Sequence, residues 1–309
     1  MMELLMGEYR RQQEALPYLP AATVFSEVLQ GRLLQLVQNG RGAVALGDGG
    51  FLGFLAGYPA DGLFGHDRGV YSPLYGHSTI VAGRAEIYEI LYAKAAALWV
   101  GENLLSHALT MYAYDRENVD HWFWRGFGMR CVDAVCPVTR PGEAQSRCPV
   151  RKLGVEDIPD IAQLHSEHNA FYRGSPIFMP NVWTEPCQEL AHWMEQSNHH
   201  LWAAYQDQQA VAYMRIEPDG ESFIAEHPSM MNITGAYVAP THRGAGFGTA
   251  LLDAIKNWLY RQGFCLLGVD YEGLNPQARG FWGRHFAPYT FSLTRRIDER
   301  IRNTDGGQH

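Results

Sequence analysis

The sequence predicts a mixed α/β fold made of two similar halves. Two observations indicate it: the order of the elements that can be assigned in residues 150–298, and three short matches between the halves. The matches are separated by 158, 159 and 160 residues. Three matches at nearly the same separation favour a duplicated domain of about 150 residues over a solenoid, whose repeats are about 20–50 residues long. The matched positions are Phe123 with Phe281 (FWRGFG and FWGRHF), Asp48 with Asp207 (two turns), and Pro20 with Pro180 (YLP and FMP).

Two segments of the second half have the apolar spacing of amphipathic helices. Residues 155–171 begin with acids, and their apolar side chains recur at intervals of three and four residues, as on one face of a helix. Residues 248–263 show the same spacing and end at Gly263, a residue suited to a helix C-terminus. A loop and a shorter helix are predicted over residues 275–286.

The strands of this half are predicted from runs of apolar and β-branched residues. Residues 201–217 form two such runs around a polar turn, which is typical of a hairpin. Residues 232–238 form a short strand, and residues 264–271 are apolar throughout, as in a strand buried on both faces. Residues 290–297 form a closing strand. Together these segments predict a mixed sheet flanked by helices.

A polar stretch that contains two prolines, residues 138–152, separates the two halves. We therefore predict one domain over residues 1–140, a linker over 141–152 and a second domain over 153–309.

Composition limits the possible partners and location. The chain has 309 residues and a formal net charge of −8, which argues against general binding of nucleic acid or of an anionic membrane. No apolar stretch approaches the roughly 18 residues of a membrane helix, and the first residues lack the apolar core of a secretory signal. Five cysteines without a CxxC pair indicate reduced thiols. We expect a cytoplasmic protein that is a monomer or a homodimer.

The most informative segment is HRGAGFGT, residues 242–249, between a predicted strand and a predicted helix. Free N–H groups and the positive dipole end of a helix N-terminus attract anions, and Arg243 adds charge. The alternative is a tight turn that needs glycine for its geometry alone. A P-loop would require a lysine that is missing here, and the dinucleotide fingerprint spaces its glycines differently from Gly244, Gly246 and Gly248.

The spacing Arg243-x-x-Gly246-x-Gly248, between YVAP and TALL, resembles the acetyl-coenzyme A loop of the GCN5-related N-acetyltransferases. NPQARGFW, residues 275–282, resembles the second cofactor segment of that family. The resemblance implies two tandem acyl-CoA N-acyltransferase-like domains, acetyl-CoA as co-substrate, and no metal. It also implies a pyrophosphate on the amides of 243–248 and pantetheine between strands 232–238 and 264–271. The implied cofactor-binding residues are Val238, Arg243, Gly244, Ala245, Gly246, Phe247, Gly248, Thr249, Asn275 and Phe281.

The first half departs from this pattern. Where the loop should fall it reads STIVAGRAEIYEILYAK, in which Gly83 and Arg84 remain but no Arg-x-x-Gly-x-Gly is present. We predict a degenerate domain that keeps the fold without a cofactor site; a second ligand site is the alternative.

The implied chemistry is direct attack of an amine on an acetyl thioester, which needs a donor to the carbonyl oxygen and a base for the ammonium. By resemblance, the donor is a backbone N–H near Tyr237 or Val238. Asp270 and Glu272 lie two residues apart on one strand, so both can face the site and act as the base.

Other candidates for proton transfer are weaker. His227 is a second candidate for the base. Many members of the family carry a tyrosine acid where this chain has Trp282, whose indole cannot act as an acid; either no acid is used, or Tyr271 or Tyr289 serves. The segment HSEH, residues 165–168, puts two histidines on one helix face, where they could hold a metal. It is not the HExxH motif, and it lacks a third metal ligand.

Two classes of function follow. The favoured one is an N-acetyltransferase acting on a primary amine of a small molecule or peptide, such as a peptide terminus, an aminoglycoside-like compound or a polyamine. The alternative is a non-catalytic acyl-CoA-binding or sensor module, suggested by Trp282 and by the lost motif of the first half.

Overall fold

The computed structural model describes residues 1–140, 148–180 and 186–306, and it confirms the mixed α/β class. The chain forms two compact units. One consists of Met1–Val132 with Pro288–His309, and the other of Asp133–Ala287. Among the described helices, none is both long and apolar enough to cross a membrane.

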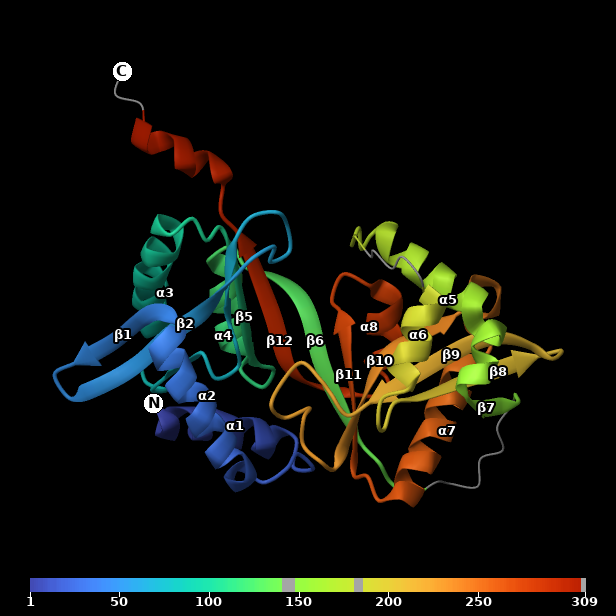
Figure 1. The fold of residues 1–309 in the computed structure, drawn as a ribbon. Helices are drawn as coiled ribbons and strands as arrows, with labels where there is room; N and C mark the ends of the chain where they lie inside the picture. Colours follow the sequence, from blue (N-terminus) through green and yellow to red (C-terminus); the bar gives the residue numbers. More distant parts are fainter. Residues whose placement is uncertain (141–147, 181–185, 307–309) are drawn as a thin grey trace. The chain divides into compact units, whose positions relative to one another are not determined.

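The second unit is a sheet in the strand order β7-β8-β9-β10-β11-β6 with helices on both faces (Figure 1). β10 pairs in parallel with β11, whereas the pairs β7–β8, β8–β9 and β9–β10 are antiparallel. The strands are β6 (Gly128–Pro137), β7 (Val150–Leu153), β8 (His200–Gln206), β9 (Gln209–Glu217), β10 (Met230–Val238) and β11 (Leu266–Glu272). The helices are α5 (Ile158–Arg173), α6 (Pro186–Met194), α7 (Phe247–Gln262) and α8 (Pro276–Trp282).

Alternation along β8 shows why helices cover both faces of this sheet. Leu201 and Ala203 are fully buried in one cluster with Ile161 of α5. Trp202 points the other way and packs against Trp258 of α7, with the ring centroids 5.5 Å apart. Side chains of a strand alternate between faces, so one apolar strand can support two helical layers.

The predicted elements of this half form where the sequence places them. The helix predicted over 155–171 is α5, the hairpin is β8–β9, and the helix after the glycine loop is α7. Gly263 ends α7 in the left-handed region, at φ 85°. Within the predicted linker, residues 141–147 lie outside the described residues, and Val150–Leu153 forms β7.

The first unit contains the strands β1-β2-β3-β5-β12, with β4 paired to β2. Its last strand, β12, pairs antiparallel with β5 from Thr290–Tyr112 to Arg296–Ser106. The closing strand of the sequence is thus part of the first unit rather than of the unit built by residues 153–286. The strands are β1 (Arg41–Gly47), β2 (Gly50–Ala60), β3 (Gly69–Ser72), β4 (His77–Thr79), β5 (Ser106–Tyr112) and β12 (Ala287–Arg296).

The helices of the first unit bury two separate apolar clusters. Leu5 of α1 and Leu33 and Leu36 of α2 pack on Phe54 of β2. Trp122 of α4 is fully buried among other aromatic rings, including Tyr88 and Tyr92 of α3. These helices are α1 (Met2–Ala15), α2 (Ser26–Asn39), α3 (Arg84–Gly101) and α4 (Arg116–Trp124).

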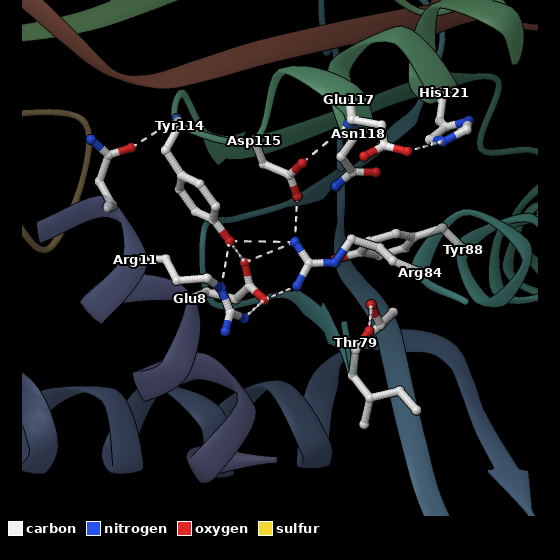
Figure 2. A network of polar contacts seen from close by, with 12 residues as sticks. Glu8, Arg11, Thr79, Arg84, Tyr88, Tyr114, Asp115, Glu117, Asn118 and His121 are labelled. Carbon is white, nitrogen blue, oxygen red and sulfur yellow. Dashed lines mark hydrogen bonds and ion pairs between the residues drawn. The ribbon is translucent and has the colours of Figure 1, made fainter. Parts of the chain in front are cut away.

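A buried polar network joins α1 to the start of α3 in this unit (Figure 2). Arg84 donates to the carboxylates of Glu8 and Asp115. Tyr114 also donates to Glu8 and accepts from Arg11 Nε at 2.9 Å. The side chains of Arg84, Glu8 and Asp115 are only 13%, 10% and 14% exposed. Burial and the Glu8 carboxylate together raise the pKa of Tyr114 to about 12, so this hydroxyl stays protonated.

The network yields a stability prediction. We expect Glu8→Gln to lower the free energy of unfolding by about 3 kcal/mol, the low end for breaking a buried pair, because Asp115 still compensates Arg84. Urea unfolding followed by tryptophan fluorescence measures it. The control Arg151→Gln breaks the exposed contacts of Arg151 with Asp157 and Asp160 and should cost less than about 1 kcal/mol. Equal losses in the two variants would contradict a structural role for the network.

Candidate functional site

The site begins where β10 and β11 separate. These strands pair from Met230–Leu266 to Ile233–Val269 and no further. A register shift between Ile233 and Gly235 puts a bulge at Thr234, after which β10 continues against β9 only. Arg215 Nη2 donates to the carbonyl of Thr234 at 3.1 Å and holds the bulge. The second half of β10 therefore presents backbone to an open space instead of to a neighbouring strand.

The glycine loop lies at the end of β10 and leads into α7. Gly244 and Gly246 are left-handed, at φ 80° and 94°, and nothing lies within 4 Å of where their side chains would be. Gly248 serves another purpose, because a Cβ there would lie 3.3 Å from the ring of Phe281. The first N–H groups of α7 have no acceptor inside the helix. Two glycines thus allow the backbone conformation, and the third allows close packing.

The loop and the gap between the strands belong to one cavity of about 800 Å³. This volume lies in the range of sites for cofactors and small molecules. Every predicted catalytic residue lines it, and so does every predicted cofactor-binding residue except Ala245, which is exposed. The residues brought together are Tyr237, Val238, Arg243, Gly244, Gly246, Phe247, Gly248, Thr249, Asp270, Glu272, Asn275 and Phe281.

Arg243 and Asn275 fix the walls of this cavity. Arg243 donates from Nε to the carbonyl of Val238 at 3.1 Å and from Nη1 to Oε1 of Gln277 at 2.8 Å. It therefore ties the loop to the end of β10 and to α8. The side-chain oxygen of Asn275 accepts from the N–H groups of residues 277 and 278 and caps α8.

The carboxyl of Asp270 has an unusually high pKa. Burial, with added repulsion from Glu221 and Glu272, raises the pKa of its carboxyl to about 7. The side chain is accessible to solvent within the cavity, yet protein surrounds it closely. Water held in a cavity solvates a charge less well than bulk water does, so the charged form of this carboxyl is disfavoured. A base with a pKa near the working pH is the most effective one.

The structure separates the other proton-transfer candidates. Tyr271 lines the cavity, whereas Tyr289 belongs to the first unit. His227 accepts or donates a hydrogen bond at 2.8 Å with Ser229 and is not among the cavity-lining residues. Trp282 is buried and packs edge-on against Phe281 and Phe286. Burial, together with Glu167, raises the pKa of Tyr237, so its phenol is protonated at neutral pH.

Sequence reasoning missed the contribution of α5 and β9 to the cavity. His165 and His168 of the HSEH segment both line it, and both turn toward the hydroxyl of Tyr213 on β9. The spacing of three residues on a helix was the available signal, since it puts both rings on one face. No group of three or more metal-ligating side chains occurs in the part of the chain that the structure describes.

Residues 161–286 match the model of the Acetyltransferase (GNAT) family. Residues 161–286 of the second unit form a GNAT domain. Solved structures agree in fold. A GCN5-related N-acetyltransferase from Sphaerobacter thermophilus is 13% identical, with a TM-score of 0.54 over 83% of this chain and 81% of its own. A GNAT-family acetyltransferase from Colwellia psychrerythraea is 10% identical, with a TM-score of 0.50 over 82% and 84%. No curated protein sequence matches this chain.

The family match confirms the predicted family for residues 161–286, and the solved structures confirm the predicted fold class. Both structures cover more than four fifths of the chain, which is consistent with two tandem domains rather than one GNAT domain beside an unrelated segment. The bulge, the glycine loop and the carboxylates of β11 all lie within the residues that match the family.

Asp270 gives the GNAT domain a measurable pH dependence. The folded-state pKa lies above the ordinary value of 3.8, so the folded protein holds this proton more tightly than the unfolded chain does. Wild-type stability should therefore fall relative to Asp270→Asn as the pH rises from about 4 to about 7, and the difference should be constant above that range. Urea unfolding at pH 4, 6 and 8 measures it.

The matched control is Asp253→Asn, which changes an exposed carboxylate on α7. It should show the same pH dependence as the wild type. A constant difference between Asp270→Asn and the wild type over the whole range would mean that the Asp270 carboxyl titrates normally.

Proposed function

We propose that the protein is an N-acetyltransferase that transfers an acetyl group from acetyl-CoA to a primary amine of a small molecule or peptide. The observation that supports this most is the single cavity that joins the unfilled glycine loop to the gap between β10 and β11. The loop offers helix N-terminal amides to a pyrophosphate, and the gap offers backbone to an extended pantetheine chain.

The residues of the chain suit this chemistry. Bound acetyl-CoA would supply the acetyl thioester. Asp270 would take the proton of the incoming ammonium, since its pKa of about 7 leaves a large fraction ionised at neutral pH. Glu272 would help to attract the cation. A backbone N–H near Tyr237 or Val238 would stabilise the oxyanion that forms on the thioester carbonyl.

The departing thiolate does not require an acid from the protein. A thiol has a pKa of about 8.5 and is a good leaving group near neutral pH. Trp282 then acts by packing under Phe281 rather than by donating a proton, in agreement with its burial.

We also infer that the first half, residues 1–140, is a GNAT-like domain that holds no cofactor. Its α3 begins after Gly83, which is left-handed at φ 68° as Gly246 is at the start of α7. The adjacent Arg84 is already paired with Glu8 and Asp115 of the same unit. Carboxylates of the chain itself therefore neutralise the cation that a phosphate would need.

The alternative is a binding module that holds acyl-CoA without turning it over, and the tryptophan at the usual acid position favours it. Thiol release from acetyl-CoA in the presence of an amine panel distinguishes the two functions. The proposal requires amine-dependent release, whereas the module would bind acetyl-CoA and release none with any amine.

The loop assignment can be tested by calorimetry. We expect Gly246→Asp to abolish acetyl-CoA binding, because the new carboxylate would occupy the position of the pyrophosphate and repel it. The matched control is Gly263→Asp at the opposite end of the same helix. Both glycines are left-handed, at φ 94° and 85°, with open space around them, so the two substitutions impose similar backbone strain.

Gly263→Asp should keep near wild-type affinity. Retention of binding by Gly246→Asp, or equal loss in both variants, would show that this loop does not hold the cofactor.

A further inference from the structure

A cluster of three side chains that the proposed chemistry does not use lines the same cavity. Nδ1 of His165 lies 2.9 Å from the hydroxyl of Tyr213, and Nδ1 of His168 lies 2.6 Å from the same hydroxyl. His165 and Tyr213 are buried, and His168 is half-buried and stacks on the ring of Tyr237 at 5.3 Å. We call these three residues the His-Tyr-His cluster.

The hydrogens of this cluster can be counted. A phenol donates one hydrogen bond, so Tyr213 can donate to one Nδ1 only and must accept from the other. One imidazole therefore carries its proton on Nδ1 and the other carries it on Nε2. The phenol stays protonated, because burial raises its pKa well above the ordinary value. The two histidines are thus held in opposite tautomers.

Both imidazoles are neutral at physiological pH. Burial, together with the neighbouring His165, Arg215 and Arg243, lowers the pKa of His168 to about 3. Burial and Arg215 lower that of His165 to about 4. The positive charges that act on His168 are those of Arg215 and Arg243, while the carboxylate of Glu167 acts on the adjacent Tyr237. Asp270 and Glu272 on β11 are carboxylates, so an ammonium is favoured beside Asp270, and the neutral imidazoles suit an uncharged group.

We propose that His168 positions the acceptor amine through a hydrogen bond between its Nε2 and an uncharged polar group of that molecule, such as a hydroxyl or a carboxamide. This inference rests on the proposed function. Nδ1 is engaged by Tyr213, so Nε2 is the atom of His168 that remains for a ligand. Tyr213 and His165 fix the tautomer of His168, and this tautomer decides whether Nε2 donates or accepts the hydrogen bond. The acceptor is then an amine with a neighbouring polar substituent rather than a simple alkylamine or a polycation.

The tautomers can be observed without any substrate. Long-range ¹H–¹⁵N spectra of protein labelled in its histidine rings should show His165 and His168 neutral from pH 5 to 8 and in opposite tautomers. Tyr213→Phe should abolish this complementarity. Identical tautomers, or titration of either ring near pH 6.5, would overturn the proposal.

Matched amines test the role in the reaction. Alaninamide and 3-methyl-2-butylamine have the same size and differ in a carboxamide, and ethanolamine and propylamine differ in a hydroxyl. With acetyl-CoA as donor, we expect the wild type to prefer the polar member of at least one pair by about tenfold in kcat/KM, as one hydrogen bond allows. The preference should arise in KM for the amine.

Two substitutions separate positioning from a structural role. In His168→Asn the amide overlies Nδ1, so the contact with Tyr213 can persist while the Nε2 position is empty. In His168→Gln the amide reaches the Nε2 position instead. The preference should be lost in His168→Asn and partly kept in His168→Gln, with KM for acetyl-CoA unchanged in both. His227→Asn, which changes a histidine outside the cavity lining, should behave as the wild type.

The outcomes distinguish this inference from the proposed function. Turnover without selectivity in the wild type, or a preference that persists in His168→Asn, overturns the role of His168 and leaves the transferase intact. A uniform loss of activity toward all four amines in both His168 variants indicates a structural role only and also overturns it. No amine-dependent thiol release by the wild type overturns the proposed function and the role of His168 together.

Discussion

The separation of β10 from β11 after Ile233 is the constraint on which the rest of the second unit depends. A continuous ladder would fill the space that the cavity occupies. The bulge at Thr234 ends the ladder, and Arg215 donates a hydrogen bond to the carbonyl of Thr234. Nε of Arg215 lies 2.7 Å from where a Cβ at Gly235 would be, so glycine at this position leaves room for the guanidinium. The glycine loop follows the freed half of β10, and the carboxylates of β11 are on the strand that parts from it.

Burial acts on the groups around this cavity in opposite directions. It raises the pKa of Asp270 to about 7 and lowers that of His168 to about 3, because in both cases the charged form loses solvation. As a consequence, the carboxyl and the imidazoles have different roles. Asp270 can exchange a proton near neutral pH, whereas the imidazoles cannot and remain as uncharged hydrogen-bonding groups. The positive charges of Arg215 and Arg243 contribute to the low pKa of His168, because they disfavour a protonated imidazole.

The sequence predicted the loop, α7 and the carboxylates of β11 well, because each depends on local chemistry. Glycines that must be left-handed, an apolar helical face and an apolar strand are visible in a single segment. The strand with which a given strand will pair is not visible in that strand's own sequence. Residues 290–297 have the same pattern whichever sheet they join, so their pairing with β5 could not be predicted from them.

Side chains that meet from distant segments were the other part that sequence reasoning could not supply. Glu8 and Arg84 are 76 residues apart, and His168 and Tyr213 are 45 apart. HSEH indicated two histidines on one helix face, yet the hydroxyl that joins them comes from β9. Without it, the spacing offered only a metal pair that lacked a third ligand.

The central claim is that acetyl-CoA binds along β10 and the glycine loop of the second unit and at no corresponding place in the first. Amide hydrogen exchange with and without acetyl-CoA tests it directly, because it reports on both helix N-termini in one measurement. We predict that acetyl-CoA protects residues 234–238 and 244–249 and leaves residues 84–90 unchanged. Protection at the start of α3, or no protection around the glycine loop at a saturating concentration of acetyl-CoA, would contradict the account.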